Sequence, residues 1–91
     1  MQTVSITVTG KVQGVFFRKY TKEAAGKIGV TGFVKNTSGE EVYIEISGSE
    51  AQIKEMILWC HKGSPWSKVS EVKVGTLSLK HFEDFRIQYG A

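Results

Sequence analysis

Residues 4–18 read VSITVTGKVQGVFFR, and this stretch decides the fold of the chain. Its first six residues alternate apolar and polar side chains, a pattern that predicts a half-buried strand over Thr3–Thr9. Gly10 and Gly14 frame a loop, and apolar residues recurring at every fourth position predict a helix over Phe17–Ile28. The stretch therefore carries the chain from the end of a strand into the start of a helix.

The loop between this strand and this helix has the features of an anion-binding site. The first turn of a helix offers unpaired backbone N–H groups and the positive end of the helix dipole. Gly10 and Gly14 permit unusual backbone dihedrals, and Arg18 supplies a planar cationic fork that suits phosphate oxygens. The spacing by itself leaves a second interpretation open, in which the glycines shape a simple strand–helix connection and Arg18 is a solvated surface charge.

A hairpin is predicted after the first helix. A strand is expected over Val30–Asn36, and a polar turn follows it over Thr37–Glu40. The next strand alternates in the same way, with Val42, Ile44 and Ile46 facing inward and Tyr43, Glu45 and Ser47 facing outward. Two strands joined by so short a turn predict an antiparallel hairpin.

The second half of the chain adds a helix and two further strands. Ser49 and Gln52 form a capping box at the start of a helix that is expected to end near Lys62. A fourth strand is expected within Ser67–Gly75, and a short last strand over residues 85–89. The inward-facing residues of the fourth strand are expected to be Val72 and Val74.

This order of elements, β-α-β-β-α-β with a short extra C-terminal strand, predicts the fold class. Both helices must bury their apolar faces against one face of the sheet, which gives a ferredoxin-like α+β two-layer sandwich with an antiparallel sheet. No linker, repeat or low-complexity stretch interrupts residues 1–91, so a single domain is expected.

Composition narrows the class of protein further. The single cysteine, Cys60, rules out an intrachain disulfide and a CxxC metal site, and is expected to fill space in the core. The chain contains neither a run of about 18 apolar residues nor the basic start of a signal peptide. The net charge of +3 favours small anions over duplex nucleic acid. We therefore expect a cytoplasmic monomer without membrane or nucleic-acid partners.

Two segments resemble the signature of a known enzyme family. The pattern Val-x-Gly-x-Val-Gln-Gly-Val-x-Phe-Arg is matched without substitution over residues 8–18. A second family-like segment, Gly-Phe-Val-Lys-Asn, occupies residues 32–36, with Val42 and Gly48 at the expected later spacings. In these motifs, their order and the chain length, the sequence resembles the small acylphosphatases of the common type. The resemblance covers essentially the whole chain and implies the same ferredoxin-like fold.

The resemblance also implies an activity and its residues. The activity is hydrolysis of the carboxyl–phosphate bond of a small-molecule acyl phosphate, without a metal or other cofactor. Arg18 and Asn36 correspond to the catalytic pair of the family, with Asn36 orienting the attacking water. The backbone of the phosphate-binding loop is contributed by Gln13, Gly14, Val15, Phe16, Phe17 and Arg18.

The residues themselves leave several of these roles open. Asn36 is equally typical of a turn residue that closes a strand. Phe16, at the variable position of the loop motif, either reaches the rim of a site to meet the acyl group or packs in the core. Glu40 stands where the family pattern has glycine, which leaves the turn after Asn36 undefined. The chain continues to Gly90–Ala91, so no contact between the terminal carboxylate and Arg18 is assigned.

Two other classes of function are compatible with the sequence. Ferredoxin-like sheets also serve as non-catalytic binding modules for RNA or phosphorylated ligands, and Phe33 and Tyr43 lie on strands where aromatic residues would stack on bases. The cluster of basic and aromatic residues typical of RNA-recognition domains is missing. Alternatively, the chain acts as an acylphosphatase-like domain within or beside a larger enzyme.

Overall fold

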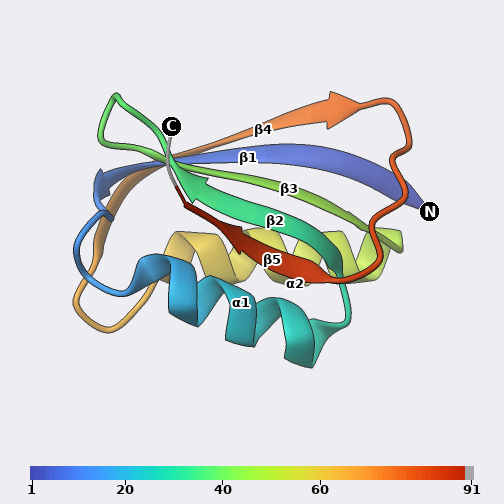
Figure 1. Ribbon diagram of the computed structural model, residues 1–91, viewed down its shortest axis with the longest axis horizontal. Coiled ribbons are helices and arrows are strands. Elements are labelled where there is room, and N and C mark those ends of the chain that lie inside the picture. Colours follow the sequence, from blue (N-terminus) through green and yellow to red (C-terminus); the bar gives the residue numbers. More distant parts are fainter. Residues whose placement is uncertain (90–91) are drawn as a thin grey trace.

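Two helices cover one face of a five-stranded sheet in the computed structural model, which describes residues 1–89 (Figure 1). The elements follow the predicted order, β-α-β-β-α-β with a short last strand. Their bounds are β1 Gln2–Lys11, α1 Phe17–Ile28, β2 Thr31–Asn36, β3 Val42–Gly48, α2 Glu50–Lys62, β4 Lys68–Leu77 and β5 Phe85–Gln88. The ferredoxin-like fold class is confirmed, as is the capping box of Ser49 and Gln52 at the start of α2.

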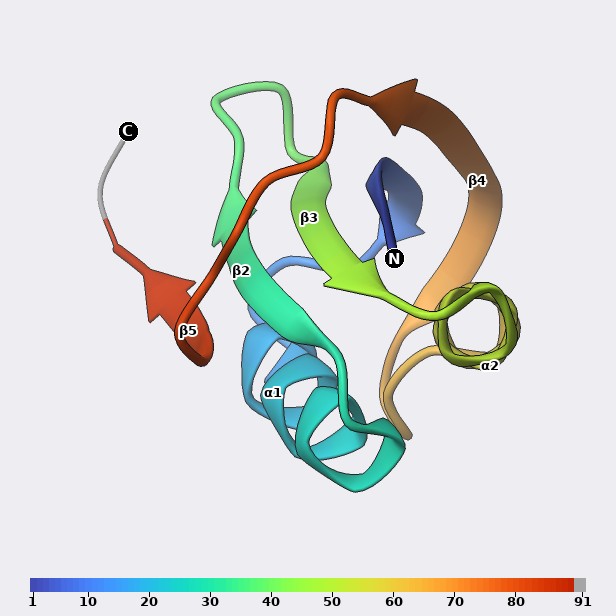
Figure 2. The same ribbon diagram turned by 90° about the vertical axis from the view of Figure 1, so that its right-hand side faces the viewer.

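The strands lie in the order β4-β1-β3-β2-β5, and the first four of them pair antiparallel. β5 instead pairs with β2 in parallel, from Gly32 opposite Phe85 to Lys35 opposite Gln88. The prediction of an antiparallel sheet is therefore wrong for this pair. The reason lies in residues 78–84, which cross the sheet from β4 to its opposite edge and enter β5 beside the start of β2 (Figure 2).

The core lies between the sheet and the helices. Cys60 is fully buried in it, and burial raises the pKa of its thiol to about 12, which fits the predicted role of a core-filling residue. Val74 was predicted to face inward but is 47% exposed. Val74 lies on the same face as Ile6, its partner on β1. It stays partly exposed because β4 is an edge strand of the sheet and has no neighbouring strand on its outer side. The central apolar residues are Ile6, Val8, Val34, Val42, Ile44, Ile46 and Met56.

Residues 78–84 also cover part of the open face of the sheet, the face without helices. Ser47 Oγ donates to the carbonyl of Lys80 at 2.7 Å, and Lys80 Nζ forms an ion pair with Glu45 Oε1 at 2.8 Å. Glu45 and Ser47 were predicted to face outward from the core, yet they are only 7% and 1% exposed because of this cover. The Tyr43 hydroxyl donates to Glu45 Oε2 at 2.6 Å. Burial, together with this hydrogen bond, raises the pKa of Tyr43 to about 12.

Four segments meet at one end of the sheet. β1 and β2 end there, β3 begins there, and α1 begins there after the loop that follows β1 (Figure 1). Val42 pairs with Val8 on one side and with Asn36 on the other, which places the ends of β1 and β2 on either side of β3. This arrangement brings the loop before α1 and Asn36 to the same end of the molecule.

Candidate active site

Apolar side chains hold the loop between β1 and α1 to the body of the protein. Val12, Val15 and Phe17 are only 1%, 8% and 2% exposed. Ser64 Oγ, from the segment after α2, donates to the carbonyl of Val15 at 3.3 Å. The backbone of the loop is therefore positioned by core packing, independently of any ligand.

The backbone of this loop is arranged to receive an anion. Gly14 and Phe16 have left-handed dihedrals, with φ of 73° and 58°, and alternation of this kind turns successive N–H groups toward one side. Phe16 is the N-cap of α1, and its side chain makes no capping hydrogen bond. Within residues 1–89, the N–H groups of residues 14–18 have no hydrogen-bond acceptor. The start of α1 thus offers unpaired donors at the positive end of the helix dipole.

The two glycines of the loop motif serve different purposes. At Gly10, an added Cβ would overlap the carbonyl oxygen of Lys68, because β1 and β4 approach closely where the register shifts after Thr9. At Gly14, an added Cβ would meet nothing within 4 Å, so glycine is required there by the left-handed backbone. Gly10 therefore permits the close approach of β1 and β4, and Gly14 shapes the loop before α1.

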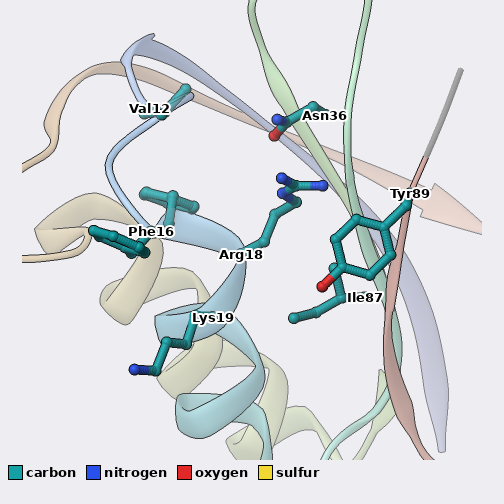
Figure 3. A pocket seen from close by; sticks show the side chains of 9 residues that line it. Val12, Phe16, Arg18, Lys19, Asn36, Ile87 and Tyr89 are labelled. Atoms are coloured by element: carbon teal, nitrogen blue, oxygen red, sulfur yellow. The ribbon is translucent and has the colours of Figure 1, made fainter.

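Arg18 and Asn36 face one cavity from different elements (Figure 3). The cavity has a volume of about 450 Å³. Arg18 extends from the first turn of α1, and Asn36 is the last residue of β2. The guanidinium of Arg18 lies 5.0 Å from the ring centroid of Tyr89, a cation–π contact that helps to orient it. The cavity is lined by Val12, Gly14, Phe16, Phe17, Arg18, Lys19, Asn36, Ile87 and Tyr89.

Arg18 brings a positive charge that no carboxylate in residues 1–89 neutralises. The ion pairs of this part of the chain are Lys54–Glu50, Lys80–Glu45 and Arg86–Asp84. The terminal carboxylate, whose contact with Arg18 the sequence left unassigned, lies outside the described residues. Within residues 1–89, the guanidinium is therefore not paired with a carboxylate and is available to bind an anion in the cavity.

Asn36 carries a buried acceptor without a partner in the described part of the chain. Its Oδ1 atom is shielded from solvent and makes no hydrogen bond within residues 1–89. A buried acceptor left unpaired typically costs about 1–3 kcal/mol, so such groups call for an explanation. In Figure 3 the side chain of Asn36 points into the same space as Arg18. The unpaired amide side chain of Asn36 therefore adds a polar group to the lining of the cavity that Arg18 also faces.

The structure shows where Phe16 and Phe17, the two aromatic residues of the loop, lie. It also shows two cavity-lining residues that the sequence did not indicate. Phe16 is 68% exposed at the rim of the cavity, so the alternative of core packing is wrong. Phe17 is a core side chain, so only its backbone can serve the loop. Ile87 and Tyr89 line the other side of the cavity, and the sequence predicted them only as strand residues. Nothing in their local pattern could have placed them there, because β5 reaches β2 through tertiary pairing.

Gln13 was predicted to contribute its backbone to the phosphate-binding loop. Its side chain is not among the residues that line the cavity. Instead, its Nε2 atom donates to the carbonyls of Thr37 and Glu41, at 2.9 Å and 2.8 Å. The sequence could not reveal these contacts, since they join positions 24 and 28 residues apart.

Glu40 adopts the backbone conformation expected of the glycine that the family pattern has at this position. Its φ is 67°, in the left-handed region, whereas Gly39 has no positive φ. A side chain in this region costs about 1–2 kcal/mol, and the greater freedom of glycine in the unfolded chain offsets part of that. We therefore expect Glu40→Gly to raise the free energy of unfolding by about 0.5–1 kcal/mol, measured by urea unfolding followed through tryptophan fluorescence.

The matched control for this change is Gly39→Ala. An added Cβ at Gly39 would meet nothing closer than 3.8 Å, so Gly39→Ala should not destabilise the protein. If Glu40→Gly left the stability unchanged or lowered it, the left-handed strain assigned to Glu40 would be wrong.

The remaining titratable candidates lie away from the cavity. His61 and His81 are exposed and do not line it. Within residues 1–89, no group of three or more His, Cys, Asp or Glu side chains is placed to hold a metal ion. The helices of this part of the chain are too short or too polar to cross a membrane.

The fold and the cavity define a small α+β sandwich protein whose strand–helix loop and arginine suit a small anion. Residues 4–87 match the family model described as Acylphosphatase. The chain is 40% identical to acylphosphatase-2 of Bos taurus, over 98% of this chain and 94% of that protein. The crystal structure of acylphosphatase from Bacillus subtilis is similar with a TM-score of 0.94 and 36% identity, over 98% of this chain and 100% of that one. The chain belongs to the acylphosphatase family, which are acid anhydride hydrolases.

Proposed function

We propose that this protein hydrolyses the carboxyl–phosphate anhydride bond of acyl phosphates and releases a carboxylate and inorganic phosphate. Membership of the family supports this class of reaction. The observation that carries the mechanism is that the side chain of Asn36, whose Oδ1 has no partner within residues 1–89, lines the cavity that Arg18 also faces. An unpaired acceptor beside an anion site suits a water molecule that attacks a bound phosphoryl group.

The leaving group of an acyl phosphate departs without help from an acid. Its conjugate acid is a carboxylic acid with a pKa of about 4 to 5, so the carboxylate is stable at neutral pH. Within residues 1–89, neither a carboxylate nor a histidine lines the cavity. The titratable side chains that line it are those of Arg18, Lys19 and Tyr89, and a substrate whose leaving group needs no protonation suits such a lining.

The phosphoryl group carries the charge that must be stabilised while the bond breaks. Catalysis of phosphoryl transfer is mostly positioning and electrostatic stabilisation. The N–H groups of residues 14–18 bind phosphoryl oxygens, and the guanidinium of Arg18 binds two of them as a planar fork. Because core packing positions the loop before the substrate arrives, these donors need little reorganisation during the reaction.

Asn36 orients the nucleophile. Its Oδ1 accepts a hydrogen bond from a water molecule, whose oxygen attacks phosphorus on the side opposite the carboxylate. The new oxygen–phosphorus bond forms while the bond from phosphorus to the carboxylate oxygen breaks, and the electron pair leaves with the carboxylate. The proton lost by the water passes to a phosphoryl oxygen, since neither a carboxylate nor a histidine lines the cavity within residues 1–89.

A function limited to binding RNA is not favoured by the open face of the sheet. The ring of Phe82 lies 6.1 Å from that of Phe33, and the hydroxyl of Tyr43 is bound to Glu45. These contacts engage the two aromatic residues that would stack on bases. A module that binds a phosphorylated ligand without turnover is distinguished from our proposal by the following assay.

The protein is expected to hydrolyse benzoyl phosphate in the presence of EDTA and to leave glycerol phosphate, an alkyl monoester, largely intact. An alkoxide is far more basic than a carboxylate and requires a general acid, whereas within residues 1–89 neither a carboxylic acid nor a histidine lines the cavity. Phosphate release from both substrates, with and without EDTA, is the measurement. Activity lost on chelation and restored by magnesium would contradict the metal-free mechanism. Phosphate binding without hydrolysis of benzoyl phosphate would identify a binding module instead.

A further inference from the structure

We propose that Gln13 is a positioning residue, which holds the turn over residues 37–41 and thereby places Asn36 opposite the anion-binding loop. This inference rests on the proposed function, because Gln13 is argued to act through Asn36, the residue proposed to orient the attacking water. It gives the side-chain amide of Gln13 a role other than binding phosphate.

The side chain of Gln13 connects the loop before α1 to the turn between β2 and β3. Its Nε2 donates to the carbonyl of Thr37 at 2.9 Å and to that of Glu41 at 2.8 Å. The amide group therefore uses both of its hydrogens on main-chain atoms of one turn. Because Gln13 does not line the cavity, its side chain acts on the turn and not on a bound anion.

The two carbonyls that Gln13 holds belong to the turn that begins directly after Asn36. Asn36–Val42 is the last pair of the β2–β3 ladder. Thr37 closes the turn with two hydrogen bonds. Its N–H donates to the carbonyl of Glu41 at 2.9 Å, and its Oγ1 accepts from the N–H of Glu41 at 3.1 Å. Gln13 thus holds the carbonyl of Thr37 and the Glu41 carbonyl that accepts from the Thr37 N–H, so a shift of Thr37 would move the adjacent Asn36 as well.

The side chain of Gln13 contributes more to the position of the turn over residues 37–41 than to the position of the loop before α1. Residues 38–40 are exposed, and among residues 1–89 the hydrogen bonds that tie residues 37–41 to another part of the chain outside the β2–β3 ladder come from Gln13. The loop, in contrast, is also held by the buried side chains of Val12, Val15 and Phe17. Loss of the Gln13 amide should therefore release the turn and leave the anion-binding loop in place.

The variant that tests this role is Gln13→Met, which removes the two donors and keeps the length of the side chain. We expect kcat for benzoyl phosphate to fall by about 10-fold to 100-fold, because misplacement of a catalytic group by about 1 Å can cost about 10²-fold. The inhibition constant of inorganic phosphate should change by less than about 2-fold, since the donors of the loop stay in place. Gln13→Ala is the second variant, in case methionine disturbs the packing.

Gln52→Met is the matched control. Gln52 Nε2 also donates to two main-chain carbonyls, those of Ile28 at 3.3 Å and Gly29 at 3.4 Å, but at the other end of α1 from the cavity. Its loss should lower stability without lowering kcat. If Gln13→Met lost no more kcat than Gln52→Met, Gln13 would have no positioning role and the proposal would be overturned.

A double-mutant cycle with Asn36→Ala tests the route of the effect. If Gln13 acts through Asn36, Gln13→Met lowers kcat in the parent protein and has little further effect in the Asn36→Ala background. The same factor in both backgrounds would overturn the proposal. A loss of phosphate affinity in proportion to kcat would also overturn it, because Gln13 would then act through the anion-binding loop.

A spectroscopic measurement makes the test independent of turnover. In ¹⁵N NMR spectra, Gln13→Met should shift the side-chain amide signal of Asn36 and the backbone signals of residues 37–41, whereas Gln52→Met should not. An unshifted Asn36 signal would overturn the proposal. If the parent protein failed to hydrolyse benzoyl phosphate, the proposed function would fail, but this spectrum would still decide whether Gln13 positions Asn36.

Discussion

Arg18→Gln is expected to lower kcat/KM for benzoyl phosphate by about 10³-fold or more, because a single arginine that stabilises a transferring phosphoryl group is worth about 10³-fold to 10⁵-fold in other enzymes. Inhibition by inorganic phosphate should weaken as well, since the same guanidinium binds the product. The fold should survive, because Arg18 forms no ion pair with a carboxylate in residues 1–89. Steady-state kinetics, phosphate inhibition and thermal unfolding measure the three quantities.

Two further variants separate the roles of charge and geometry. Arg18→Lys should recover only part of the activity, because a point charge cannot bind two phosphoryl oxygens as a planar fork. Lys22→Gln removes the same charge from an exposed position one turn further along α1 and should leave the kinetics close to those of the parent. An Arg18→Gln protein that bound phosphate and turned over like the parent would show that the anion site is wrongly assigned.

Asn36→Ala should lower kcat for benzoyl phosphate by about 10²-fold, which is typical for the loss of one orienting polar group. The inhibition constant of inorganic phosphate should stay nearly unchanged, because Asn36 is assigned to the water and not to the phosphoryl group. This pattern differs from that of Arg18→Gln, in which binding and turnover both fall. Parallel measurements of kcat and phosphate inhibition on the two variants make the comparison.

The stability of Asn36→Ala provides a second signature. Since Oδ1 is buried and has no hydrogen-bond partner within residues 1–89, its removal should not lower the free energy of unfolding and should raise it by up to about 1–3 kcal/mol. A turn residue whose side chain served the fold would lose stability and keep activity. An unchanged kcat would therefore return Asn36 to a structural role, and a fall in phosphate affinity equal to that of Arg18→Gln would make it a substrate-binding residue.

The parts of the fold that the sequence predicted well are those governed by local rules. The alternation over Thr3–Thr9 and Val42–Ser47 predicted the strands, because neighbouring side chains in a strand must face opposite sides of the sheet. The start of α2 followed from the capping box, and α1 followed from the periodicity of its apolar residues. The motif over residues 8–18 likewise predicted a strand, a loop and a helix start that the structure contains.

The sequence predicted the face on which a residue lies better than its exposure, because exposure depends on distant segments. Val74 has the pattern of an inward-facing residue, but an edge strand leaves it exposed. Glu45 and Ser47 have the pattern of outward-facing residues, but residues 78–84 cover them. The parallel pairing of β5 depends on the same crossing segment, whose path no local periodicity specifies.

The candidate site also has features that follow from local sequence and features that depend on distant segments. The sequence by itself predicted the strand–helix loop and placed Arg18 in the first turn of the helix, because consecutive residues place N–H groups and a helix start through their own backbone conformations. Only the tertiary structure decided that Asn36 points into the same cavity, that Tyr89 contacts Arg18, and that Gln13 holds the turn after Asn36. These contacts depend on strand register and on the packing of segments far apart in the chain, and such pairings form only when the whole sheet assembles on its core.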